Sequence, residues 1–128
     1  MHACNDDHPE ELLKLLQSPE EAAGLRIVDV RDFDFDRPIV NPSNPTINIT
    51  KDEFIDDLDQ KYFPLLQEEP ILVFHCALSQ VRGPKCAQRY CVKLRSVHTN
   101  PTQKVYILQG GHETFYARYA KEYPELFQ

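Results

Sequence analysis

Two short, unbroken apolar runs constrain the fold of this chain more than any other feature. Residues 71–74 (Ile-Leu-Val-Phe) and 105–108 (Val-Tyr-Ile-Leu) each hold four consecutive apolar residues. Runs of this kind are typical of strands that are buried on both faces of a sheet. Such strands need helices packed on both sides, so the two runs predict an α/β fold.

The order of the other elements supports the same fold class. Residues 26–30 read as a further strand, and residues 46–49 as a short one within a proline-rich loop. Strands that alternate with helices indicate a mostly parallel sheet with helices on both faces. Four helices are expected: one capped by Asp7, one opened by a capping box of Thr50 and Glu53 and ended by Pro64, one at 83–95, and one after Gly110.

The size and charge of the chain limit what it can do. Its 128 residues fit a single domain spanning 1–128, with residues 1–6 expected as a flexible tail. The balance of 14 basic against 20 acidic residues gives a net charge of −6, which disfavours nucleic-acid binding. The longest apolar run is too short to span a bilayer, so no membrane partner is expected.

The cysteines indicate the compartment and argue against a metal site. The polar, acidic N-terminal residues do not form a secretion signal, so the four cysteines are expected as free thiols in the cytoplasm. No pair of cysteines or histidines has the spacing of a structural zinc site, so no metal is expected. An anionic substrate would have to be captured by local groups, against the field of the whole molecule.

The loop after the 71–74 strand carries the chemistry. Cys76 is followed by five residues and then Arg82, and Pro84 marks the start of a helix. A link of this length can curl so that its backbone N–H groups face inward and add to the positive end of the helix dipole. Arg82 can close this cradle with a planar guanidinium that matches two oxygens of a tetrahedral anion. The expected oxyanion ligands are Ala77, Leu78, Ser79, Gln80, Val81 and Arg82.

The same field favours the thiolate form of Cys76, which is the nucleophilic form. The sequence therefore predicts an enzyme that attacks a tetrahedral oxyanion with Cys76. Three further residues are candidate supporting groups. His75 adjoins the nucleophile, Cys86 lies on the helix behind the loop as a second thiol, and Asp29 can pair with Arg31.

Several segments resemble one enzyme family. Residues 75–84 (His-Cys-Ala-Leu-Ser-Gln-Val-Arg-Gly-Pro) are similar to the loop of the rhodanese-fold cell-cycle phosphatases and the related eukaryotic arsenate reductases. Residues 28–32 match the family's second-strand signature, and 105–111 match its strand and glycine turn. Residues 39–41 and 115–116 are similar to the small protozoan-type arsenate and antimonate reductases. The resemblance implies a rhodanese-like domain of about five strands, with Cys76 as nucleophile and Arg82 as oxyanion ligand.

Departures from the phosphatase pattern favour the reductase. Val30 stands where the cell-cycle phosphatases carry a back-door cysteine, and the neutral Gln80 and Val81 replace their acidic loop residue. A reductase needs a second thiol, which glutathione, glutaredoxin, another redox protein or Cys86 can supply, and no bound cofactor. The expected substrate is arsenate, antimonate or a phosphate ester.

Three alternatives remain open. A protein tyrosine or dual-specificity phosphatase shares the first chemical step. Thiosulfate sulfurtransferases of this fold generally use a loop one residue shorter. A catalytically idle binding module usually lacks the cysteine or the arginine, and both are present here as Cys76 and Arg82.

Overall fold

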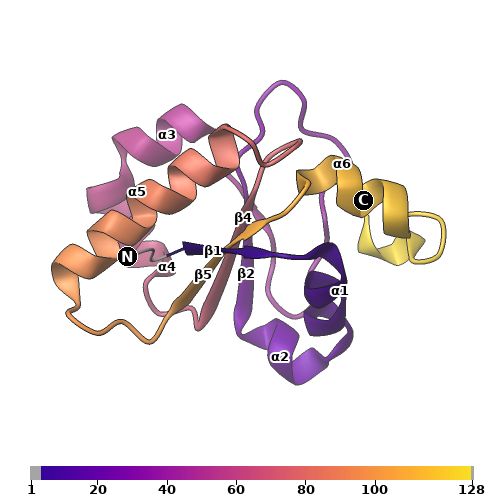
Figure 1. Ribbon diagram of the computed structural model, residues 1–128, viewed down its shortest axis with the longest axis horizontal. Helices are drawn as coiled ribbons and strands as arrows, with labels where there is room; N and C mark the ends of the chain where they lie inside the picture. Colours follow the sequence, from indigo (N-terminus) through magenta and orange to yellow (C-terminus); the bar gives the residue numbers. More distant parts are fainter. Residues whose placement is uncertain (1–3, 128) are drawn as a thin grey trace.

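The strands form one parallel five-stranded sheet in the order β1-β5-β4-β2-β3 (Figure 1). The computed structural model describes residues 4–127. The prediction of an α/β fold with a mostly parallel sheet is confirmed, and β4 lies at the centre of the sheet. The strands are β1 (Cys4–Asp7), β2 (Leu25–Asp29), β3 (Ile47–Asn48), β4 (Ile71–His75) and β5 (Lys104–Leu108).

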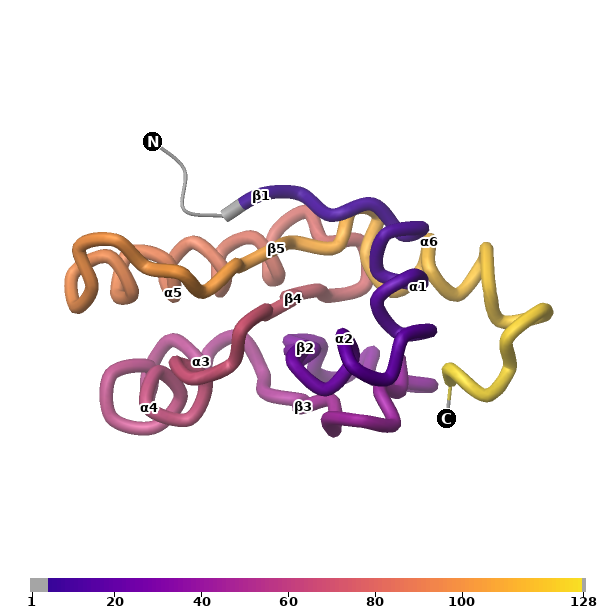
Figure 2. The backbone as a smooth tube through the Cα atoms, turned by 90° about the horizontal axis from the view of Figure 1, so that it is seen from below, coloured from indigo at the N-terminus to yellow at the C-terminus, as the bar shows by residue number. Residues whose placement is uncertain are grey.

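The helices cover both faces of this sheet (Figures 1 and 2). One face carries α3 (Lys51–Asp56), a π-helical turn at Leu58–Tyr62, α4 (Phe63–Leu66) and α5 (Arg82–Val97). The other carries α1 (Pro9–Gln17), α2 (Pro19–Ala23), α6 (Gly111–Tyr119) and a 3-10 turn at Pro124–Leu126.

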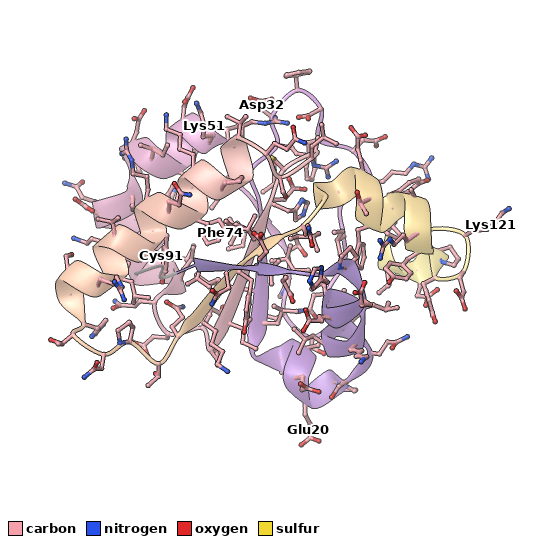
Figure 3. All side chains as sticks on the ribbon, in the orientation of Figure 1. Glu20, Asp32, Lys51, Phe74, Cys91 and Lys121 are labelled. Carbon is pink, nitrogen blue, oxygen red and sulfur yellow. The ribbon has the colours of Figure 1, made fainter. Side chains whose placement is uncertain are left out.

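Alternate residues of β4 build the two cores. Leu72 and Phe74 pack on the α5 side, and Val73 packs on the α1 side. Phe74, labelled in Figure 3, lies near the middle of the molecule. It meets Phe54 edge-on with ring centroids 5.4 Å apart, and it also contacts Tyr90 of α5. An unbroken apolar strand requires this packing on both sides. The packing also fixes the carboxyl end of β4, which Cys76 directly follows.

The N-terminal segment differs from expectation. Residues 4–6 were expected in a flexible tail, yet Cys4–Asp7 forms β1 and pairs with β5 at the sheet edge; residues 1–3 lie outside the described part of the chain. Asp7 is therefore the buried last residue of a strand and cannot cap the first helix. His8 takes the N-cap position, and its backbone N–H donates to Glu11 at 3.4 Å.

The segment around Pro64 also differs from expectation. Thr50 caps α3 as predicted, because its hydroxyl accepts from the Glu53 N–H at 3.4 Å. Pro64 was expected to end this helix, but it lies in the first turn of α4, where the missing N–H costs nothing. The change of direction instead uses the π-helical turn, in which the Tyr62 hydroxyl donates to the Glu53 carboxylate.

Across residues 4–127, no helix combines the length and apolarity that a bilayer span would require.

Candidate active site

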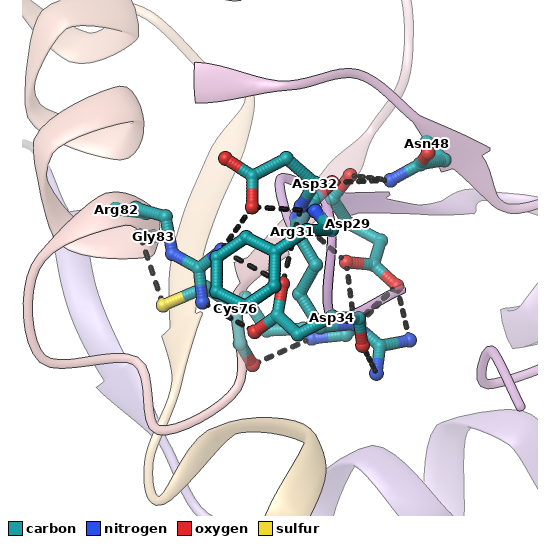
Figure 4. Close-up of polar contacts among 10 residues, drawn as sticks. Asp29, Arg31, Asp32, Asp34, Asn48, Cys76, Arg82 and Gly83 are labelled. Atoms are coloured by element: carbon teal, nitrogen blue, oxygen red, sulfur yellow. Dashed lines mark hydrogen bonds and ion pairs between the residues drawn. The ribbon is translucent and has the colours of Figure 1, made fainter. Parts of the chain in front are cut away.

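Cys76 lies directly after the central strand β4, at the carboxyl end of the sheet, where open α/β folds place their sites. Its side chain is 3% exposed, and the sulfur accepts a hydrogen bond from the Gly83 N–H at 3.3 Å (Figure 4). A Cβ at position 83 would lie 3.3 Å from the backbone of His75 and Cys76. Glycine at 83 therefore lets the first turn of α5 approach the strand end closely enough to contact the thiol.

The backbone of the loop is oriented by the first turn of α6. The Cys76 carbonyl accepts from the His112 N–H at 3.0 Å, and the Ala77 carbonyl accepts from the Glu113 N–H at 2.9 Å. In a trans peptide the N–H points opposite to the carbonyl. The N–H groups of Ala77 and Leu78 therefore point away from α6.

The loop N–H groups have no acceptor in the protein. Among the described residues, none of the six N–H groups of residues 77–82 donates to a backbone or side-chain atom. Successive backbone N–H groups that are not used within the protein form the kind of concavity that binds anions, and here they lie next to a thiol. Ser79 has a φ of 55°, which lets the loop curl, and its buried hydroxyl also has no partner.

Arg82 begins α5 and is held by two carboxylates (Figure 4). Asp34 binds both terminal nitrogens, with Oδ1 2.9 Å from Nη1 and Oδ2 2.7 Å from Nη2. Asp32 adds a contact of 3.1 Å to Nη1. Hydrogen bonding to Arg82 lowers the pKa of Asp34 to about 2, and the same pairing raises the pKa of Arg82.

Asp29 and Arg31 form a buried ion pair next to the loop. The Arg31 guanidinium donates to both carboxylate oxygens of Asp29, with Nη2 2.8 Å from Oδ2 and Nε 3.0 Å from Oδ1. The predicted pairing of these residues is therefore present, and neither side chain is more than 3% exposed. Both carboxylate oxygens of Asp29 are therefore already occupied by Arg31.

His75 is fully buried on the far side of the strand end. Its Nδ1 lies 3.1 Å from the Cys76 carbonyl oxygen, and its Nε2 lies 3.8 Å from Asp29 Oδ2. Burial lowers the pKa of His75, so the ring is neutral at pH 7. The structure gives it a backbone contact rather than a contact with the thiol.

The two cysteines of α5 are both buried in the core beneath the loop. Cys86 is a free thiol with no exposed surface, and burial raises its pKa to about 12. Cys91 is disulfide-bonded, so the expectation that all four cysteines are free thiols is wrong for Cys91.

A polar pocket of about 300 Å³ adjoins the loop. His112 was not predicted from the sequence as a site residue. Its ring Nε2 lies 2.6 Å from the Arg37 carbonyl oxygen, and its backbone N–H donates to the Cys76 carbonyl of the loop. The sequence interpretation also missed the contacts of Asp32 and Asp34 with Arg82, although the position of these residues just after β2 could have indicated them. The pocket is lined by Arg31, Asp34, Asp36, Arg37, Ala77, His112, Glu113 and Tyr116.

Comparisons with known proteins agree with this architecture. The dual specificity phosphatase ibp1 of Schizosaccharomyces pombe is 33% identical over 120 residues, which cover 82% of each chain. Arsenate reductase 2.2 of Oryza sativa subsp. japonica is 38% identical over 104 residues, covering 79% of this chain and 73% of the relative. No protein-family model matches the sequence. The chain belongs to the family of rhodanese-fold arsenate reductases and dual specificity phosphatases.

Solved structures support the same assignment. The As-Sb reductase of Leishmania major is 35% identical with a TM-score of 0.82, covering 98% of this chain and 85% of the neighbour. A yeast protein tyrosine phosphatase of the Rhodanese family, at 21% identity and a TM-score of 0.71, covers 96% and 91% and shares the fold. As a member of this family the protein is an enzyme.

Proposed function

We propose that the protein reduces arsenate or antimonate, with the Cys76 thiolate as nucleophile and the loop of residues 77–82 as oxyanion cradle. The observation that carries this proposal is the run of six loop N–H groups without a protein acceptor, next to a thiol bonded to the first turn of α5. Arg82 supplies the positive charge of the cradle. These local groups are needed because the chain as a whole carries a net charge of −6.

In the first step, the Cys76 thiolate attacks the arsenic atom of the singly charged dihydrogen arsenate anion. A sulfur–arsenic bond forms and one arsenic–oxygen bond breaks. The departing hydroxyl group takes up a proton from the solvent and leaves as water, which gives a thioester of arsenate on Cys76. The loop N–H groups and Arg82 stabilise the charge on the remaining oxygens, which is the electrostatic form of catalysis.

In the second step, a thiolate attacks the sulfur of Cys76. A disulfide forms, the sulfur–arsenic bond breaks, and its electron pair stays on arsenic, which leaves as arsenite. Arsenic(V) is thereby reduced to arsenic(III), and two thiols are oxidised to one disulfide. A second equivalent of thiol then releases Cys76 by thiol–disulfide exchange.

The second thiol in this proposal is external. Cys86 has no exposed surface and a pKa of about 12, so little of it is thiolate at neutral pH. Cys76 follows the carboxyl end of β4 and is 3% exposed, so in this proposal a small thiol such as glutathione, or a glutaredoxin, reaches its sulfur through the active-site loop once the arsenate adduct has formed. Because the reaction depends on such reductants, we propose that the enzyme acts in a reducing compartment, the cytoplasm, in spite of the disulfide at Cys91.

Phosphatase activity is the second candidate function. It is favoured by the similarity to the dual specificity phosphatase of Schizosaccharomyces pombe, which extends over 82% of both chains. The first step would be the same, and water would then hydrolyse a phospho-cysteine. Reduction as the main activity is supported by the similarity to the As-Sb reductase of Leishmania major, which is 35% identical with a TM-score of 0.82 over 98% of this chain.

The test is a paired assay of the purified protein on arsenate, with glutathione and glutaredoxin, and on an aryl phosphate. Thiol-dependent conversion of arsenate to arsenite is expected in wild type and in Cys86→Ser, and none in Cys76→Ser. Turnover of the aryl phosphate alone would replace the proposal with the phosphatase. Arsenate turnover that persists in Cys76→Ser would refute the assigned nucleophile.

A further inference from the structure

The guanidinium of Arg82 forms hydrogen bonds to carboxylates along one of its edges. Asp34 binds the edge formed by Nη1 and Nη2, at 2.9 and 2.7 Å. Asp32 contacts Nη1 as well, with a single oxygen at 3.1 Å. Within residues 4–127, the Nε of Arg82 has no hydrogen-bond partner. The side of the guanidinium that carries Nε and the second Nη2 hydrogen therefore keeps two parallel donors unused.

Asp34 is itself held in place by hydrogen bonds from residues 31 and 32. Its carboxylate Oδ1 accepts from the Asp32 N–H at 3.2 Å, and its backbone carbonyl accepts from Arg31 Nη1 at 3.4 Å. Arg31 is anchored by the buried Asp29 at the end of β2. A chain of contacts thus runs from the sheet core through Arg31 and Asp34 to the loop arginine (Figure 4).

The strand β3 fixes the same segment from the other side. The Asn48 side-chain amide donates to the carbonyl of Asp29 at 2.9 Å and to the carbonyl of Arg31 at 3.0 Å. The backbone on both sides of residue 30 is therefore tied to two neighbouring strands. These contacts fix the point at which the arm formed by residues 32–34 leaves the sheet.

We propose that Asp34 is the positioning residue of the active site: it holds Arg82 by its Nη1–Nη2 edge so that the Nε–Nη2 edge faces the oxyanion cradle. The inference rests on the proposed function, because it concerns the same site. It assigns a purpose to the Asp29–Arg31 pair, which supports the arm that presents Asp34.

Two physical effects of Asp34 have opposite signs, and their balance makes the proposal testable. An arginine side chain has many rotamers, and fixing it before the substrate arrives removes an entropic cost of binding. The Asp34 carboxylate also cancels part of the Arg82 charge, which weakens attraction for an anion. If Asp34 positions Arg82, removing its charge weakens oxyanion binding; if Asp34 is a competing anion, the same change strengthens binding.

The experiment measures how well inorganic phosphate protects Cys76 from alkylation by iodoacetamide, with site occupancy read by mass spectrometry. The variants are Asp34→Asn, Asp34→Glu and the matched control Asp36→Asn. Asp36 lies in the same pocket wall, and among the described residues it makes no hydrogen bond or ion pair with Arg82. Both Asn variants remove one negative charge near the site, so their difference isolates the contact with Arg82.

The expected result is a phosphate affinity about tenfold weaker in Asp34→Asn than in Asp36→Asn, the upper end of what freeing one long side chain costs a binding site. Asp34→Glu should recover part of this loss, since it restores the carboxylate. In an Arg82→Lys background, which lacks the planar fork, Asp34→Asn should have a much smaller effect. Equal or tighter phosphate binding in Asp34→Asn would overturn the positioning function.

A second readout separates this inference from the proposed function. If phosphate does not protect wild-type Cys76, the oxyanion cradle fails, but the position of Arg82 can still be measured. Anionic iodoacetate should alkylate Cys76 faster relative to neutral iodoacetamide when Arg82 faces the thiol. This ratio should fall in Asp34→Asn and stay near the wild-type value in Asp36→Asn. An unchanged ratio in Asp34→Asn would overturn the inference by itself.

Discussion

Gly111, the first residue of α6, packs against the backbone of the active-site loop at residues 76 and 77. Its replacement by alanine should displace that loop and reduce turnover. Its φ is +64°, and a Cβ there would lie 2.5 Å from the Ala77 carbonyl oxygen and 2.7 Å from that of Cys76. Contacts below 3.0 Å force something to shift. The atoms that must shift are the two carbonyls that accept from His112 and Glu113.

The size of the effect follows from these contacts. The left-handed conformation costs an alanine roughly 1–2 kcal/mol. Weakening the two hydrogen bonds adds about 1 kcal/mol each. The sum is roughly 3–4 kcal/mol, which lowers the melting temperature by about 12–16 °C for a domain of this size. A loop displaced by a fraction of an ångström should also lose turnover, by on the order of 10-fold or more.

Gly110→Ala is the matched control. Gly110 also has a positive φ, of 79°, but its Cβ would meet the side chain of Thr114 within the same turn, not the active-site loop. Both variants should therefore lose stability, whereas arsenate turnover measured well below both melting temperatures should fall in Gly111→Ala and remain within about threefold of wild type in Gly110→Ala. Similar turnover in the two variants would refute the view that α6 shapes the cradle.

Three further predictions concern the charged groups. Arg82→Ala should weaken turnover by on the order of 10²-fold or more, the effect of removing a preorganised oxyanion ligand, and steady-state kinetics will show a smaller loss if Arg82 is not one. Asp29→Asn should cost about 3–5 kcal/mol, because it leaves the buried charge of Arg31 without its partner; a urea midpoint close to that of wild type would contradict this. The pKa of Asp34 is lowered from 3.8 to about 2, so its pairing stabilises the fold fully above about pH 4 and this contribution disappears as the pH falls toward 2. Melting temperatures of wild type and Asp34→Asn should therefore differ at pH 5 and converge near pH 2, and a gap that widens in acid would exclude this linkage.

Most of the fold could be predicted because its central strands carry a strong apolar signal. Residues 71–74 and 105–108 read as buried strands in the sequence alone, and both occupy the middle of the sheet. β1 could not be found in this way, since its residues are polar and an edge strand is held mainly by backbone hydrogen bonds to β5. The continuation of the helical segment through Pro64 was missed because proline both ends helices and begins them.

For the candidate site too, the features that depend on the local sequence could be predicted, and those that depend on tertiary contacts could not. Cys76 and Arg82 could be identified because their spacing and their place between strand and helix are local properties of the sequence. The contact of Arg82 with Asp34 joins residues 48 positions apart, and nothing in the local pattern distinguishes Asp34 from Asp36. The hold of α6 on the loop likewise depends on tertiary packing rather than on sequence spacing.

The nucleophile and the resolving thiol are both tested by measuring the mass of the protein after a single turnover with arsenate and glutathione. One glutathione adduct is expected on Cys76. It should form only when arsenate is present, persist in Cys86→Ser, and be absent in Cys76→Ser. An arsenate-dependent disulfide between Cys76 and Cys86 would contradict the external thiol. The absence of any arsenate-dependent change at Cys76 would contradict the central claim that this thiolate attacks the oxyanion.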